Sequence, residues 1–150
     1  MSDIKQPSEL FTAIVLEIFK VNGLLANEGD RITSEFGLSS ARWKVLGALS
    51  LAQEPLTVSQ IARNMGLTRQ AVQRLADEMQ KGGLLGFMDN PNHKRAKLVT
   101  VSAKGEQVYA QLDQIQRPWA QQHADAFSAE DLTTTLAVLT KISQRFTDDR

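Results

Sequence analysis

The segment VSQIARNMGLTRQAVQRLAD, residues 58–77, carries the strongest indication of the fold in this chain. It predicts two short helices that cross at a tight turn. Ala62 is small enough to let a second helix pass close by, and Gly66 can adopt the positive φ that ends the first helix abruptly. The stretch therefore favours a helix-turn-helix.

Both helix starts carry capping signals. Thr57 followed by Gln60 fits a capping box, in which each residue's side chain bonds the other's backbone N–H. Thr68 is the N-cap expected for the second helix. The two helices are therefore predicted to be short, adjacent and sharply bounded.

The polar face of the second helix carries side chains that can read DNA bases. Arginine and glutamine bind guanine and adenine edges through paired hydrogen bonds in the major groove. At helical spacing this face contains Arg69, Gln70, Gln73, Arg74 and Asp77. The alternative is that these side chains only solvate an amphipathic helix. We interpret the segment as a recognition helix because of the turn before it and the hairpin after it.

A β-hairpin is predicted to follow. An apolar run at 84–88, a breaker-rich stretch at 89–95 and an alternating segment at 97–101 come in succession. They predict two strands joined by a long basic tip. A hairpin behind a helix-turn-helix is a wing, which lies along the DNA backbone or enters the minor groove. Its candidate contacts are Lys94, Arg95 and Lys97. The alternative is a charged hairpin edge that deters aggregation.

These features resemble the MarR family of bacterial transcription regulators. The helix-turn-helix, the Gly-Leu-Leu entry into the wing and the segment DNPNHKRAKLVTVSAKG at 89–105 carry the resemblance, which covers nearly the whole chain. It implies a mainly α fold, a winged helix-turn-helix with a two-stranded β wing, flanked by N- and C-terminal dimerisation helices. One domain would span 1–150, with the winged region at about 39–101 and dimerisation helices at about 8–28 and 103–147.

The resemblance also assigns roles within the wing. Positions that match the family's wing signature are Lys94, Arg95, Val101, Ser102 and Gly105. His93 stands where many members carry an acidic residue that pairs with the wing arginine, which leaves Asp89 as the candidate partner. The implied function is a ligand-responsive repressor that binds a pseudo-palindromic double-stranded DNA operator as a homodimer. Thr57 and Thr68 would position the two helices.

Apolar stripes on both flanks of the winged region favour dimerisation. One lies on a helix expected from about Ser8 to Ala26, and two follow after residue 103. The residues predicted to form the dimer are Leu10, Phe11, Ile14, Ile18, Leu132, Leu136, Leu139, Ile142 and Phe146. The alternative is that the stripes cover one another in a monomer. Pro118 predicts a kink or break near Arg117.

A further helix is expected from about Ser39 to Leu51, with Trp43, Val45, Leu46 and Leu49 facing the core. The resemblance implies a small anionic or aromatic effector in a crevice between the winged domain and the dimerisation helices. Trp43 is the candidate for lining it, and packing in the core or at a hinge is the alternative role.

Composition agrees with a DNA partner once charge is divided by segment. The chain has 150 residues and a net charge of zero. From Thr57 to Gly105 eight Lys and Arg stand against three Asp and Glu. There is no cysteine, which excludes thiol redox sensing and Cys-ligated zinc. The polar N-terminus and the lack of a long apolar run lead us to expect a soluble, cytoplasmic protein with no membrane partner.

Catalysis finds little support. The two histidines, His93 and His123, join no nucleophile, phosphate-loop or zinc-protease pattern, so we expect no enzyme and no cofactor. A metal site at His123 and Asp125 has too few ligands to be favoured. Two rivals stay open: a winged-helix module that binds protein instead of DNA, and an enzyme with an unrecognised site.

Overall fold

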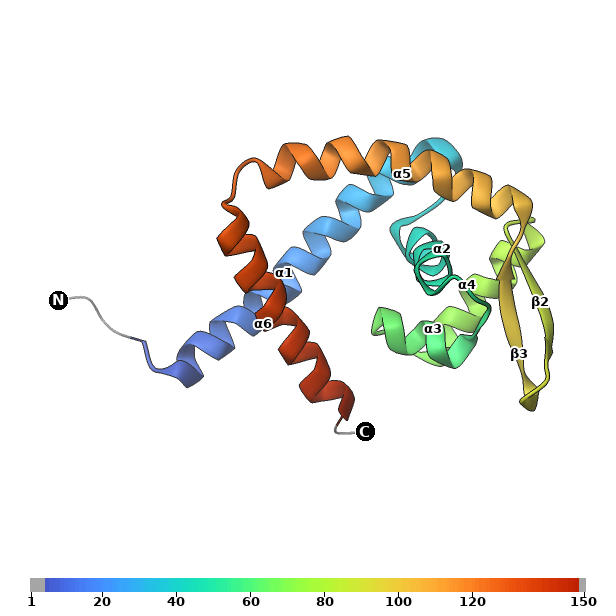
Figure 1. Cartoon of the computed structure of the whole chain (residues 1–150), viewed down its shortest axis with the longest axis horizontal. Helices are drawn as coiled ribbons and strands as arrows, with labels where there is room; N and C mark the ends of the chain where they lie inside the picture. The colour runs from blue at the N-terminus through green and yellow to red at the C-terminus, as the bar shows by residue number, and fades with distance from the viewer. Residues whose placement is uncertain (1–4, 149–150) are drawn as a thin grey trace. The chain divides into compact units, whose positions relative to one another are not determined.

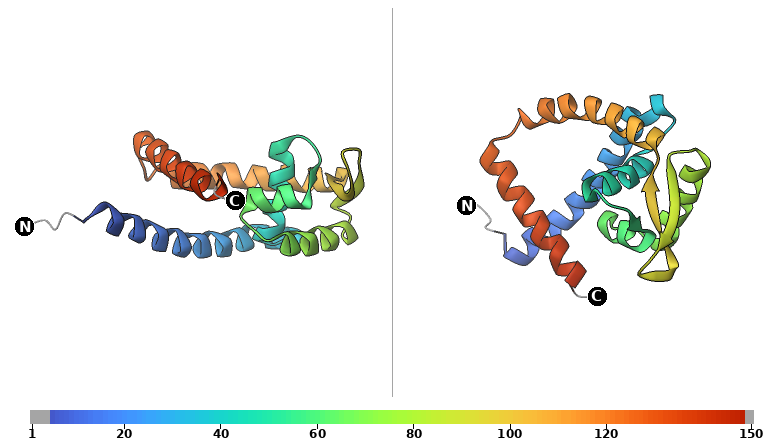
Figure 2. Two further views of the ribbon diagram at one scale, coloured as in Figure 1. Left: turned by 90° about the horizontal axis from the view of Figure 1, so that it is seen from below. Right: turned by 45° about the vertical axis from the view of Figure 1, so that its right-hand side comes forward.

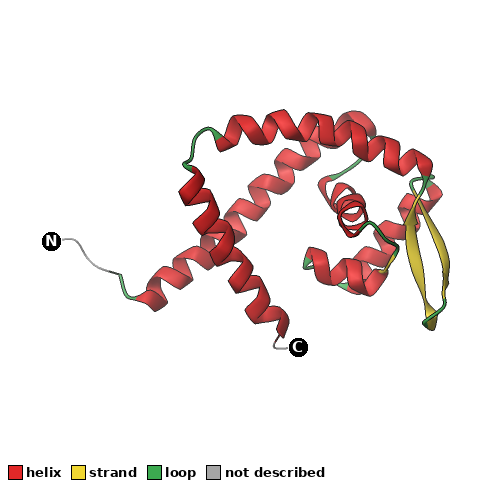
Figure 3. Ribbon diagram, in the orientation of Figure 1, coloured by secondary structure: helices red, strands yellow, loops and turns green. Residues whose placement is uncertain are grey.

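The computed structural model describes residues 5–148 and is mainly helical, with its strands confined to one small sheet (Figure 3). The elements in chain order are α1 (Pro7–Thr33), a 3-10 turn (Ser34–Phe36), α2 (Ser40–Ala52), β1 (Leu56–Thr57), α3 (Val58–Met65), α4 (Arg69–Lys81), β2 (Leu85–Asn90), β3 (His93–Val101), α5 (Ala103–Ala124) and α6 (Ala129–Asp148). The predicted mainly α winged helix-turn-helix is confirmed. None of the helices in residues 5–148 is both long and apolar enough to cross a bilayer.

The chain divides into two compact units, with the boundary inside α5 between Leu112 and Asp113. The first unit holds α1 to β3 and the beginning of α5. The second holds the remainder of α5 and the whole of α6, which begins at an N-cap: the Ser128 hydroxyl accepts the backbone N–H of Asp131 at 3.0 Å.

The core of the first unit lies between α2, α3, α4 and the sheet (Figure 1). Strand β3 is central in the antiparallel order β1-β3-β2. Apolar side chains from every one of these elements meet there and exclude water, which is the main favourable term in folding. The most buried of them are Val45, Leu46, Ile61, Val72, Ala76, Met79 and Val99.

The helix-turn-helix is formed by the local chemistry expected from the sequence. The Thr57 hydroxyl accepts the Gln60 N–H at 3.2 Å, and the Gln60 amide oxygen accepts the Thr57 N–H at 2.9 Å. Thr68 caps α4 by accepting the Ala71 N–H at 3.1 Å. Gly66 ends α3 with φ 68°, the left-handed conformation that favours glycine. The capping box, the second cap and the sharp turn are all confirmed.

The wing differs from expectation at its tip. The predicted long basic tip is wrong: β2 runs to Asn90 and β3 starts at His93, so only Pro91 and Asn92 form the turn. The Asn90 side chain stabilises it by accepting the Asn92 N–H at 3.0 Å. The two-stranded wing also gains a third strand at its base, since Leu56 of β1 pairs with Val99.

Two helices differ from their predicted bounds. Helix α1 continues past Ala26 to Thr33, and its last turns pack against α2. Helix α5 runs through Pro118 without interruption, so of the predicted kink or break near Arg117 the break is wrong, and the kink stays a prediction. A proline removes a single N–H from the ladder, and because Pro118 is exposed, water can satisfy the carbonyl that loses its partner.

Candidate nucleic-acid interface

Helix α4 is held by one apolar face, and the opposite face is left to solvent. Val72, Ala76 and Met79 are buried against the core, and Leu75 is half-buried. The side chains predicted to read DNA, Arg69, Gln70, Gln73 and Arg74, are all exposed, and so is the capping residue Thr68. This placement provides a rigid, capped helix with a row of long polar side chains pointing outwards.

One intrahelical hydrogen bond orients a member of this row. The Gln73 side chain donates from Nε2 to the Asp77 carboxylate at 3.0 Å. A paired contact with adenine needs the amide oxygen and one N–H. Because the bond to Asp77 uses only one of the two amide hydrogens, Gln73 keeps both atoms that such a contact requires.

The wing presents three cations beside this helix. Helix α4 packs against β2, and the β2–β3 hairpin extends away from that contact (Figure 1; Figure 2, right). Lys94, Arg95 and Lys97 are exposed on β3. No ion pair joins Arg95 to Asp89 among residues 5–148, so the tip is not neutralised in the way the resemblance suggested.

These cations occupy a bulge that the sequence did not reveal. Asn90 pairs with His93 and Met88 pairs with Leu98, so the four residues 94–97 of β3 lie opposite Asp89 alone. A bulge bends its strand and re-aims the side chains on it. The bulge therefore coincides with all three predicted wing contacts.

Arg63 is an exposed cation next to the recognition helix in sequence that was not predicted as a contact. Arg63 lies in the last turn of α3, just before the turn at Gly66, and its side chain is exposed. It contributes to the basic segment 57–105, and that charge excess was the one signal that pointed to it. In the described part of the chain, none of Arg63, Arg69 and Arg74 forms an ion pair with an acidic side chain.

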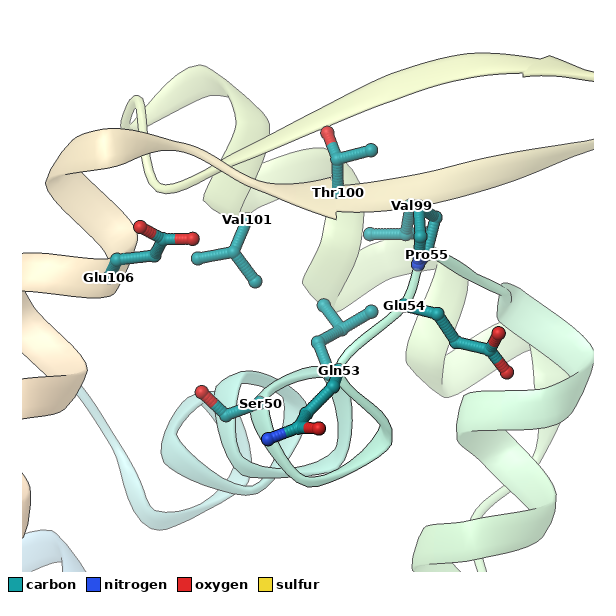
Figure 4. Close-up of a pocket in the computed structure, with 9 residues that line it drawn as sticks. Ser50, Gln53, Glu54, Pro55, Val99, Thr100, Val101 and Glu106 are labelled. Carbon is teal, nitrogen blue, oxygen red and sulfur yellow. The ribbon is translucent and has the colours of Figure 1, made fainter.

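A groove in the first unit does not suit the expected anionic effector. It has a volume of about 370 Å³, with Leu49, Val99 and Val101 among its apolar lining residues (Figure 4). The lining includes the carboxylates of Glu54 and Glu106 and contains no lysine or arginine. An anion would be repelled there.

Trp43 does not line this groove. It is half-buried on α2 and lies outside the apolar core, so its predicted place facing the core is wrong. Val45, Leu46 and Leu49, which were predicted to face the core alongside it, are buried there, so that part of the prediction is confirmed.

The predicted dimerisation residues are poorly covered within the single chain. On α1, Leu10, Phe11 and Ile14 are between 38% and 48% exposed. On α6, Leu132 and Leu139 are about as exposed, and Leu136 and Phe146 reach 67% and 60%. Ile18 and Ile142 are half-buried. Each helix thus carries an apolar face that nothing in its own unit covers fully.

His123 lies next to an aromatic side chain in α5. The ring centroids of Trp119 and His123 are 4.8 Å apart. The Asp125 carboxylate accepts a hydrogen bond from the Gln121 side chain at 2.9 Å. Within residues 5–148, no three His, Cys, Asp or Glu side chains gather closely enough to hold a metal ion.

Comparison with known proteins identifies the family. A model of the MarR family matches residues 36–96. The HTH-type transcriptional regulator TcaR of Staphylococcus aureus is 30% identical over 131 residues, which cover 85% of each chain.

Two solved structures share the fold. The transcriptional regulator BldR of Sulfolobus solfataricus superposes with a TM-score of 0.82 at 22% identity, over 94% of this chain and 99% of that one. A MarR mutant of E. coli in complex with operator DNA gives a TM-score of 0.77 at 21% identity, over 92% and 99%. The two structures establish the shared fold, and the matched family model and TcaR show that this chain belongs to the MarR family of winged helix-turn-helix transcription regulators, which are not enzymes.

Proposed function

We propose that this protein regulates transcription by binding a pseudo-palindromic operator in double-stranded DNA as a homodimer. The observation that carries the proposal is the exposed row of Arg69, Gln70, Gln73 and Arg74 on a helix whose other face is buried. Such a helix fits the major groove, and its side chains match the donor and acceptor pattern of guanine and adenine. Thr57 and Thr68 position the two helices by capping them.

The wing supplies the electrostatic part of the affinity. Lys94, Arg95 and Lys97 contact phosphates or enter the minor groove next to the recognition helix. Phosphate contacts add affinity for any sequence, whereas contacts from α4 discriminate between sequences. Substitutions on the two elements should therefore be separable by experiment.

The partly exposed apolar faces of α1 and α6 support a homodimer. Monomeric proteins seldom leave so many large apolar side chains uncovered, and a second copy buries both faces at once. A two-fold symmetric dimer presents two recognition helices to successive major grooves, about 34–36 Å apart.

Repression follows if the occupied operator overlaps a promoter. A small effector that prefers a dimer with a different helix separation need change DNA affinity by only about 1–3 kcal/mol to switch occupancy. Trp43, half-buried on α2, is the residue we propose for an aromatic contact with such an effector. Repression is tested with a reporter gene placed behind the selected operator, with and without the protein.

Salt dependence of DNA binding tests the central proposal. Three phosphate contacts from each wing give six per dimer, and a slope of log affinity against log salt of about −5. Affinity should then fall by about a thousandfold between 50 and 200 mM salt. The measurement uses fluorescence anisotropy with the duplex upstream of the protein's own gene. A winged-helix module that binds only protein would show no binding to any duplex at low salt.

A further inference from the structure

The end of α1 approaches the start of α2 unusually closely. Gly29 is buried, and a Cβ built on it would lie 2.9 Å from the hydroxyl oxygen of Ser40 and 3.0 Å from its Cβ. A side chain at position 29 therefore requires the Ser40 side chain to rotate or the two helices to move slightly apart, whereas glycine accommodates the close crossing as it stands. Gly23 lies in the same helix, and a Cβ there would meet nothing within 4 Å.

Polar bonds lock this crossing. The Asp30 carboxylate accepts the backbone N–H of Ser40 at 2.7 Å, which satisfies one of the free donors in the first turn of α2. Thr33 is fully buried, and its hydroxyl donates to the Gly29 carbonyl at 2.8 Å and lies 3.1 Å from the carbonyl oxygen of Leu38. We call Gly29, Asp30, Thr33 and Ser40 the α1–α2 joint.

Helix α2 is tied to the recognition helix only two residues further on. Arg42 donates from Nη2 to the Glu78 carboxylate of α4 at 3.0 Å. This ion pair joins two different helices, whereas the pairs Arg31–Glu28 and Arg117–Asp113 are each local to a single helix. Both side chains are partly exposed, so the pair adds little to stability.

We propose that the α1–α2 joint and the Arg42–Glu78 pair together set the half-site spacing that the dimer accepts. This inference rests on the proposed function. Helix α1 carries a dimerisation face and α4 carries the reading face, so the linkage between them determines where each recognition helix stands relative to the two-fold axis. Gly29 and Arg42 are thus positioning residues, and neither needs to touch DNA.

Half-site spacing is the readout that a merely structural role would leave unchanged. The test measures the affinity of the full chain for a pseudo-palindromic duplex selected from random DNA, and for versions with the half-sites one base pair closer or farther apart. One base pair shifts a half-site by 3.4 Å and rotates it by about 35°. The wild type should prefer the selected spacing by about tenfold or more.

Matched variants isolate the linkage. Gly29→Ala and Arg42→Ala should reduce that preference by about fivefold, with the dimer intact. Gly23→Ala, in open space on the same helix, and Arg31→Ala, which breaks the local pair with Glu28, should keep it. Unchanged spacing preference in Gly29→Ala and Arg42→Ala overturns the inference.

Charge reversal keeps the test decisive if Gly29→Ala does not fold. Arg42→Glu should lose the spacing preference, and adding Glu78→Arg should restore it. Equal preference in wild type, single and double variants refutes the inference while leaving the proposed function in place. A wild-type protein that binds none of the duplexes overturns both.

Discussion

Gly105→Ala is the substitution with the clearest structural consequence. Gly105 lies in the first turn of α5, and a Cβ there would stand 2.2 Å from the carbonyl oxygen of Leu84 and 2.8 Å from a methyl group of Val101. That carbonyl accepts the Ser102 N–H at 3.0 Å, which ties the base of the wing to the start of α5. The clash is with backbone, so no rotation of a flexible side chain relieves it.

Three contributions determine how much Gly105→Ala lowers the free energy of unfolding. Overpacking against backbone costs about 3 kcal/mol at the upper end of its usual range. Alanine recovers about 0.5–1 kcal/mol of helix propensity. Displacing α5 weakens the cap in which the Ser102 hydroxyl accepts the Gly105 N–H and donates to the Gly83 carbonyl, a loss of about 1 kcal/mol. The net destabilisation is about 3 kcal/mol.

Thermal unfolding at fixed protein concentration measures this effect. For a chain of this size, about 3 kcal/mol lowers Tm by about 6–12 °C. Gly23→Ala is the control, because its Cβ meets nothing and the helix gains propensity. If Gly105→Ala unfolds at the wild-type temperature, the close approach of α5 to Leu84 is not as described.

Three further predictions concern DNA binding and assembly. Arg74→Ala should weaken binding to the selected operator by about 1–3 kcal/mol and leave random duplex unaffected, as measured by anisotropy; an equal loss on both duplexes would make it a phosphate contact. Lys94→Ala should lower affinity for all sequences and reduce the steepness of the salt slope by about 2 per dimer, and an unchanged slope would remove it from the contacts. Leu136→Glu should weaken the dimer by about 2 kcal/mol or more in analytical ultracentrifugation, because it places a carboxylate in an apolar interface, whereas Thr134→Glu on the same helix serves as control. A dimer that survives Leu136→Glu intact would exclude this face.

The parts of the fold set by local chemistry were predictable from sequence. Thr57, Gln60 and Thr68 form their caps with neighbours three residues away, and Gly66 needs only its own φ to end α3. Short-range signals of this kind do not depend on the remainder of the chain.

The features of the fold that the sequence did not predict depend on contacts between segments that are distant in the chain. The two residues of β1 form a strand only because Leu56 and Thr57 pair with Val99 and Leu98 of β3, about forty positions away. The last turns of α1 look polar in sequence, yet Gly29 and Thr33 are buried because α2 crosses them.

For the candidate DNA-binding site, the sequence predicted which residues are exposed on α4, but it did not predict the backbone geometry of the wing. The exposed row on α4 follows from helical periodicity, which fixes one buried face and one free face. The bulge at residues 94–97 could not be predicted, because it arises from the register of β2 against β3 and not from the basic residues themselves.

Hydroxyl-radical footprinting of the selected operator tests the paired recognition helices most directly. We expect two protected regions on one face of the duplex, related by two-fold symmetry and centred about 10–10.5 base pairs apart, at a stoichiometry of two chains per duplex. A single protected region bound by one chain, or protection without symmetry, would contradict the account.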